Sequence, residues 1–245
     1  MVHHFFTAPR PLVFAHRGGA ALAPENTMVA FDQAAALGVD GFELDVRLSS
    51  DGVVVVHHDA MLDRTTNLTG PLVRQSSAVL SAADVPSLED VLTRHPHMRV
   101  IVEMKVNTAE CAARVVATIA ACDAGPRVCL GAFGRTALRA ARALAPGIAT
   151  SASREEVRWV LYRSWCRWPV ATTPYQGFQI PELAGRTRVV SPRFVEEAHR
   201  AGRRVQVWTV DHEDDAQRLL DWGVDALITD RPDVMVPLVR GRFGT

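Results

Sequence analysis

Short apolar runs with strand character alternate with amphipathic helical segments along nearly the whole chain, and this alternation restricts the fold more than any other feature. The predicted strands cover residues 12–15, 41–46, 100–106, 127–133, 147–152, 177–181, 204–210 and 225–230. A helical segment follows each of them. Eight such units in 245 residues predict an α/β fold, a single (β/α)8 or TIM barrel.

One stretch interrupts the alternation after the second strand. Residues 48–58 have the pattern of a hairpin that turns at Asp51-Gly52, and the residues that follow have no clean periodicity. No Pro-, Ser- or Gly-rich linker divides the chain. We therefore expect one domain over residues 1–245, with a short insertion at about 47–86.

Composition argues against several classes of protein. The 27 basic and 27 acidic residues give a net charge of +0 with no charged tail, which argues against a nucleic-acid partner. No apolar run is long enough to span a bilayer and no signal peptide is recognisable, so we expect a cytoplasmic protein. The cysteines lack CxxC spacing and are predicted to be free thiols; they are Cys111, Cys122, Cys129 and Cys166.

Paired carboxylates in two strands indicate a metal site. Glu43 and Asp45 lie two residues apart and project from the same face of the second strand, and Glu103 and Lys105 repeat this spacing in the third. Buried carboxylates in excess of cations repel one another, so a divalent cation is the expected partner. Oxygen ligands favour Mg²⁺ or Ca²⁺ over Zn²⁺. A plain salt bridge between Glu103 and Lys105 is the structural alternative.

Lys105 is the only lysine, since the other 26 basic residues are arginine. A lysine inside a barrel can also form a Schiff base with a carbonyl substrate. That alternative chemistry predicts trapping by borohydride and indifference to EDTA.

Further polar residues fall where a barrel places its working groups, at the C-terminal ends of strands. His16 and Arg17 end the first strand, and the two glycines after them are expected to leave backbone N–H groups open to an anion. The hairpin adds His58, whereas His57 is interpreted as its structural neighbour. Arg17, Lys105 and a cation together indicate a phosphate site.

Motifs in order along nearly the full length resemble the glycerophosphodiester phosphodiesterases. They read HRG at 16–18, PENT at 24–27, GFELDV at 41–46, DG at 51–52, HD at 58–59, RTT at 64–66, PSLEDVL at 86–92, VEMK at 102–105, VWTV at 207–210 and GVDALITDRP at 223–232. The resemblance implies a metal-dependent barrel hydrolase that cuts glycerophosphodiesters to sn-glycerol 3-phosphate and an alcohol.

The resemblance also implies roles for individual residues. The metal ligands would be Glu43, Asp45 and Glu103, the acid–base pair would be His16 and His58, and the phosphate would contact Arg17 and Lys105. Trp208 is interpreted as a residue that stacks on the substrate, or as part of the core. Two other functions stay open: a lysophospholipase D-type enzyme acting on lysolipids, and a barrel that binds phospho-ligands without catalysis.

The segment at residues 155–169 is unusually rich in aromatic residues. On a helix, one apolar stripe would contain Val157, Leu161, Ser164, Trp165 and Trp168, whereas Trp159, Tyr162 and Cys166 would lie off it. We expect this helix to pack against neighbouring barrel helices. The alternatives are a homodimer contact or a membrane-surface patch that gives access to lysolipids.

Overall fold

The protein, described here by a computed structural model over residues 3–165 and 173–244, folds into the predicted barrel. Its parallel strands neighbour one another in the order β6-β5-β4-β2-β1-β11-β10-β7. They are β1 (Leu12–His16), β2 (Gly41–Leu48), β4 (Arg99–Met104), β5 (Val128–Gly131), β6 (Ala149–Thr150), β7 (Gly177–Pro181), β10 (Arg204–Trp208) and β11 (Ala226–Thr229). A parallel bridge between Ser151 and Gly177 joins the two ends of this order, so the barrel is nearly closed.

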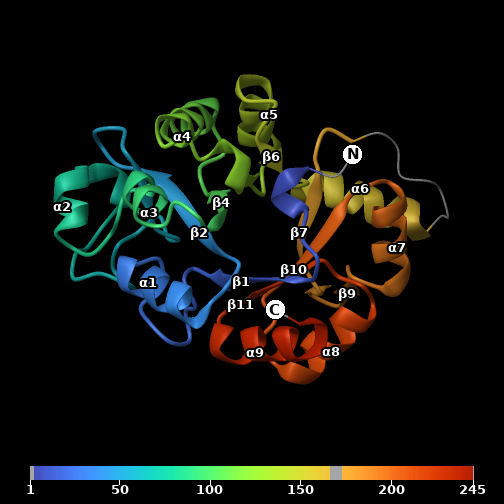
Figure 1. Cartoon of the computed structure of the whole chain (residues 1–245). Coiled ribbons are helices and arrows are strands. Elements are labelled where there is room, and N and C mark those ends of the chain that lie inside the picture. Colours follow the sequence, from blue (N-terminus) through green and yellow to red (C-terminus); the bar gives the residue numbers. More distant parts are fainter. Residues whose placement is uncertain (1–2, 166–172, 245) are drawn as a thin grey trace.

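Helices follow the strands and surround the barrel (Figure 1). They are α1 (Met28–Leu37), α3 (Leu88–Arg94), α4 (Ala109–Ala121), α5 (Arg135–Leu144), α6 (Arg154–Trp165), α7 (Pro192–Arg200), α8 (Glu213–Asp221) and α9 (Pro232–Phe243). Local sequence sets several of their ends. The Thr27 hydroxyl accepts the hydrogen bond of Ala30 N at the start of α1, and Gly38 ends that helix at φ +80°. None of the helices described is both long and apolar enough to cross a membrane.

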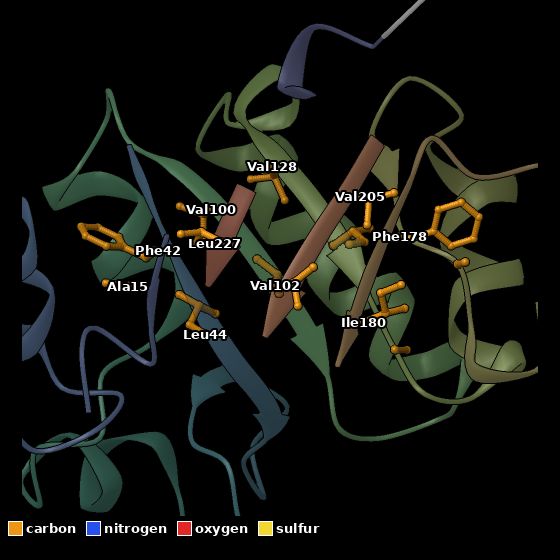
Figure 2. Packing of buried hydrophobic residues seen from close by; sticks show 14 of the residues in the cluster. Ala15, Phe42, Leu44, Val100, Val102, Val128, Phe178, Ile180, Val205 and Leu227 are labelled. Atoms are coloured by element: carbon orange, nitrogen blue, oxygen red, sulfur yellow. The ribbon is translucent and has the colours of Figure 1, made fainter. Parts of the chain in front are cut away.

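Strand alternation divides the apolar residues between two layers. Phe42, Leu44 and Val102 point outward to the helices and belong to the main core, part of which is drawn in Figure 2. Phe14 and Ile101 point into the barrel and form a smaller cluster with others. The inward positions nearer the C-terminal strand ends are then left to polar side chains, as the pattern predicts.

A short N-terminal segment covers the opposite end of the barrel. The 3₁₀ turn η1 (His4–Phe6) buries Phe5 and Phe6 in the inner cluster, and Arg99 at the start of β4 donates to Phe5 O at 3.1 Å. The barrel therefore opens at the end where the polar residues gather.

The insertion after β2 forms the predicted hairpin and a small core of its own. β3 (Val54–Val56) pairs antiparallel with β2, and η2 (Leu72–Arg74) and α2 (Ser77–Ser81) follow. The apolar residues of this cluster are Val55, Leu62, Leu72, Leu80 and Val85. A further hairpin of β8 (Leu183–Ala184) and β9 (Thr187–Arg188) was not expected from the sequence.

The cysteines within the described residues are free, as predicted: Cys111 and Cys129 are buried and Cys122 is partly exposed. Cys166 and Trp168 lie outside the described residues.

Candidate active site

The predicted carboxylates lie together at the C-terminal ends of β2 and β4. In the register between these strands, Asp45 is the partner of Glu103. Glu43, Asp45 and Glu103 all line one cavity of about 980 Å³. Asp45 is only 1% exposed and Glu43 is 8% exposed, so water does little to screen their charges from each other.

Gly131, at the end of β5, has no side chain, and the Glu103 carboxylate occupies the space where one would lie. A Cβ atom here would overlap Glu103 Oε2 and would lie 3.1 Å from Gln179 Oε1. The position of the Glu103 carboxylate therefore depends on a residue without a side chain on the next strand.

The surroundings raise the pKa of two of the carboxyl groups. Burial, and then Asp45, raises the pKa of Glu43 to about 7. Burial raises the pKa of Glu103 to about 8, and Glu43 and Asp45 raise it further, although Lys105 acts in the other direction. The cluster thus carries more acidic groups than the nearby cations can balance.

Asp45 is the carboxylate that the protein itself neutralises. Its Oδ1 lies 2.8 Å from Lys105 Nζ, its Oδ2 lies 3.2 Å from Arg17 Nε, and Asn26 Nδ2 donates to Oδ2 at 3.0 Å. Burial acts to raise the pKa of Asp45, but Lys105 and Arg17 outweigh it and hold the pKa below its ordinary value.

Within residues 3–165 and 173–244, no three His, Cys, Asp or Glu side chains are arranged as a ready metal site. Asp45 instead faces Lys105 and Arg17. The donor chemistry still fits a hard divalent cation, because the predicted ligands are all carboxylates and outnumber the two cations beside them. Asp45 Oδ1 also receives no well-oriented hydrogen bond. Glu43, Asp45 and Glu103 are therefore the residues that could hold such a cation.

His16, at the end of β1, is fixed between two carboxylates. Its Nδ1 lies 2.7 Å from Asp230 Oδ1, and its Nε2 lies 3.8 Å from Glu43 Oε2. Asp230 is held in turn by its backbone N–H, which donates to Asp211 Oδ1 at 2.7 Å. Burial acts to lower the pKa of His16, but Glu43 and Asp230 outweigh it and raise the pKa above its ordinary value.

The two adjacent histidines of the hairpin differ in their surroundings. His58 lines the cavity, and its Nδ1 lies 2.6 Å from Asp59 Oδ1. His57 is 4% exposed, and both of its ring nitrogens are engaged, by Asp59 O and Thr65 Oγ1. Of the two imidazoles, only that of His58 is among the groups that line the cavity.

The HRGG turn contradicts one expectation. Its N–H groups are not open to an anion, since Arg17 N donates to Glu43 O at 2.8 Å and Gly19 N donates to His16 O at 2.8 Å. Gly18 serves the turn itself, because it has φ +85° and a Cβ atom there would lie 2.7 Å from Ala30 Cβ. An anion in this site would therefore contact side chains.

The rim of the cavity is aromatic. Trp208, the predicted stacking residue, lies at the end of β10 and meets Phe133 edge to face, with ring centroids 6.3 Å apart. Lys105 Nζ lies 5.5 Å from the Phe133 ring centroid. Both rings line the same cavity as the carboxylates.

Helix α6 forms the outer wall of the cavity, and this corrects the predicted stripe. Leu161 and Ser164 are buried as expected, but Trp165 is 62% exposed. Trp159 and Tyr162 stack on each other and are 55% and 50% exposed. Val160, which was not in the predicted stripe, is buried beside Leu161 and Ser164, and the three aromatic residues line the cavity.

The family model that matches is the Glycerophosphoryl diester phosphodiesterase family, over residues 16–234. The chain belongs to this family.

Individual relatives agree with this assignment. A protein of Mycobacterium tuberculosis named "Probable glycerophosphodiester phosphodiesterase 2" is 35% identical, over 95% of this chain and 92% of its own. A solved structure from Silicibacter pomeroyi has a TM-score of 0.82 at 23% identity, covers 98% of both chains, and supports the fold. An Oleispira antarctica phosphodiesterase, solved in complex with the product sn-glycerol-3-phosphate, has a TM-score of 0.77 at 26% identity and covers 94% of this chain and 97% of its own.

Family membership makes the chain one of the phosphoric diester hydrolases. Four residues with no role predicted from the sequence also contact the site. Asn26 takes φ +59°, which asparagine tolerates, and holds Asp45. Glu25, Arg64 and Asp230 each contact a predicted site residue or its carboxylate partner. Asn26, Glu25 and Arg64 are signalled in the sequence by the PENT and RTT motifs alone. Asp230 lies in the GVDALITDRP motif and also ends the last predicted strand, where a barrel places its working groups.

Proposed function

We propose that the protein hydrolyses glycerophosphodiesters to sn-glycerol 3-phosphate and an alcohol, using one divalent cation, Mg²⁺ or Ca²⁺, and the imidazoles of His16 and His58. The observation that carries this proposal is the arrangement of the two histidines. Each contacts a carboxylate through Nδ1, Asp230 for His16 and Asp59 for His58, and each lines the cavity that contains the acidic cluster.

This arrangement suits proton transfer. A carboxylate that accepts from Nδ1 fixes the orientation of the imidazole and leaves Nε2 for the reaction. One imidazole removes the proton of the nucleophile, which is water or a hydroxyl of the glycerol itself. The other protonates the alcohol oxygen as it leaves.

Charge in the cavity supports the same chemistry. A phosphodiester is an anion that repels nucleophiles, and its negative charge rises in the transition state. Arg17 and Lys105 line the cavity beside the acidic cluster, and they would stabilise this charge. A cation held by Glu43, Asp45 and Glu103 would supply further positive charge and polarise the phosphoryl oxygens.

The test is turnover of glycerophosphocholine, followed through release of sn-glycerol 3-phosphate. We expect activity that EDTA abolishes and that Mg²⁺ or Ca²⁺ restores, and a loss of about 10²–10⁴-fold in His16→Ala and in His58→Ala. Activity that withstands chelation, together with a borohydride-trapped adduct, would establish the Schiff-base alternative. Binding of sn-glycerol 3-phosphate without any turnover would establish a non-catalytic phospho-ligand barrel.

The aromatic wall on α6 favours a second candidate, a lysophospholipase D-type reaction in which the leaving alcohol carries an apolar chain. Trp159, Tyr162 and Trp165 are exposed at the mouth of the cavity that holds the acidic cluster, where such a chain would lie. The same residues are the ones that a weak homodimer or membrane-surface contact through 155–169 would use.

Three measurements separate these uses of α6. If Trp159→Ala lowers kcat/KM for a lysophosphatidylcholine but not for glycerophosphocholine, the wall binds the leaving group. Changes in liposome binding or in oligomeric state would instead identify a surface contact. Phe243→Ala on α9 is the matched control, because Phe243 is also exposed, at 42%, but does not line the cavity.

A further inference from the structure

Arg64, in the insertion, contacts two carboxylates that belong to different parts of the chain. Its Nε donates to Asp59 Oδ2 at 2.6 Å. Its Nη1 and Nη2 donate to Glu25 Oε2 and Oε1 at 3.0 and 2.6 Å. The planar guanidinium thus uses one N–H of each terminal nitrogen for a bidentate pair with Glu25, and its Nε–H for Asp59.

Each of these carboxylates also holds a residue of the reaction site. Asp59 accepts from His58 Nδ1 at 2.6 Å through its other oxygen. Glu25 accepts from Arg17 Nη1 at 3.1 Å. One side chain therefore links the histidine on the insertion to the arginine at the end of β1, and Arg17 reaches Asp45 in turn at 3.2 Å.

Both carboxylates remain ionised in this arrangement. Hydrogen bonding from Arg64, and then from His58, holds the pKa of Asp59 well below its usual range. Burial acts to raise the pKa of Glu25, but Arg64 and Arg17 outweigh it and lower the pKa. An ionised Asp59 accepts only, so the proton of the pair lies on His58 Nδ1.

From this geometry we infer that Arg64 is a positioning residue that holds His58 and Arg17 in a fixed relation across the mouth of the barrel. The inference rests on the proposed function, in which His58 transfers a proton and Arg17 binds the phosphate. Arg64 itself is 49% exposed, does not line the cavity and acts only through Asp59 and Glu25.

The contacts of Arg64 with Asp59 and Glu25 should matter less for the stability of the fold than for the position of His58. An exposed ion pair contributes little to stability, and the backbone of His58 is held separately, because Arg47 Nε donates to its carbonyl oxygen at 2.9 Å. Removal of Arg64 should therefore leave the barrel folded, but leave Asp59, and with it the His58 ring, less firmly oriented.

The kinetic test uses three variants with glycerophosphocholine as substrate. We expect Arg64→Ala to lower kcat by about 10–100-fold, as loss of an orienting partner typically does. Arg64→Lys keeps the charge but lacks the planar fork, so it should recover only part of the loss. Arg74→Ala is the control, because Arg74 is an exposed arginine of the same insertion that does not line the cavity, and it should behave as the unmodified protein.

A double-mutant cycle distinguishes positioning from a general structural effect. If Arg64 acts through Asp59, the loss in Arg64→Ala/Asp59→Asn is smaller than the product of the two single losses. Losses that multiply, or full recovery by Arg64→Lys, would overturn the inference.

A second readout needs no substrate. In ¹⁵N-histidine spectra, the Nδ1 proton of His58 should be protected from exchange in the unmodified protein and in Arg74→Ala, and should exchange faster in Arg64→Ala. A His58 signal that Arg64→Ala leaves unchanged overturns the inference whatever the activity. Absence of turnover in the unmodified protein would overturn only the proposed function.

Discussion

Lys105 Nζ lies 2.8 Å from Asp45 Oδ1, so the chain's only lysine neutralises the most deeply buried carboxylate of the acidic cluster. The contact crosses from the end of β4 to the neighbouring strand β2. This contact supports the electrostatic role proposed for Lys105 over a role as an amine nucleophile.

Lys105→Gln should therefore lower kcat for glycerophosphocholine by about 10²–10³-fold, the typical cost of removing one transition-state charge partner. Borohydride should trap no adduct in the unmodified protein. The check is a steady-state assay combined with mass spectrometry after borohydride treatment. An adduct at Lys105 would contradict this role.

The metal-free protein should lose stability as pH rises, because the pKa of Glu103 is about 8 in the folded protein against 4.5 ordinarily. Between these values the folded state binds the proton and the unfolded state does not, so stability falls with pH and the loss is complete above about pH 8. Glu103→Gln removes the free-energy cost of ionising this buried carboxyl group. We therefore compare the difference in melting temperature, variant minus unmodified protein, at two pH values. This difference should be larger at pH 9 than at pH 4 by at least about 3 °C.

The control for this pH effect is saturation with Mg²⁺ or Ca²⁺, which should reduce the difference between the two proteins at pH 9. A difference that stays constant from pH 4 to pH 9 in EDTA would show that Glu103 titrates normally.

Gly131→Ala should weaken cation binding, because its methyl group would overlap Glu103 Oε2. We expect at least a tenfold rise in the Kd for Mg²⁺ or Ca²⁺, measured by titration calorimetry on the folded variant. Gly147→Ala is the control, since a Cβ atom there meets nothing within 4 Å. Equal Kd values for the two variants would show that Gly131 does not determine the position of Glu103.

The two adjacent histidines should give opposite phenotypes. His58→Ala should lose about 10²–10⁴-fold in kcat with little change in melting temperature. His57→Ala should lower the melting temperature, because His57 is buried with both ring nitrogens engaged, and should retain more activity. Exchanged phenotypes would show that the choice of His58 is wrong.

Asp230 should affect catalysis through its contact with His16. Asp230→Asn replaces a carboxylate acceptor by an amide and should lower kcat by about 10–100-fold with a smaller effect on KM. The bell-shaped pH–rate profile should also shift to lower pH on the limb that reports His16, because Asp230 raises the pKa of that group. A lower kcat with an unchanged profile would point to a structural role alone.

Much of this protein was predictable from local patterns. Alternation in GFELDV placed Phe42 and Leu44 outside the barrel and Glu43 and Asp45 inside it, and the structure agrees. Such predictions succeed because strand periodicity is set by backbone geometry over a few residues. The Asp51-Gly52 hairpin was predictable for the same reason.

Two predictions from local patterns were wrong, because the outcome depended on residues that lie far away in the sequence. The HRGG turn has the composition of an anion-binding loop, yet its N–H groups are used within the protein. Trp165 fits the apolar stripe of α6 by spacing, but it is exposed and lines the cavity. In both cases a tertiary contact, or its absence, decided the outcome.

The sequence by itself determined the barrel, the order of its strands along the chain, and which side chains face inward, because each follows from periodicity and turn chemistry within short segments. Only the tertiary structure decided which of these side chains act on one another. His16 meets Asp230 across 214 positions, and Arg64 meets Glu25 across 39. The pairing of β1 with β11 brings His16 to Asp230, and the fold of the insertion brings Arg64 to Glu25. No local pattern encodes either approach.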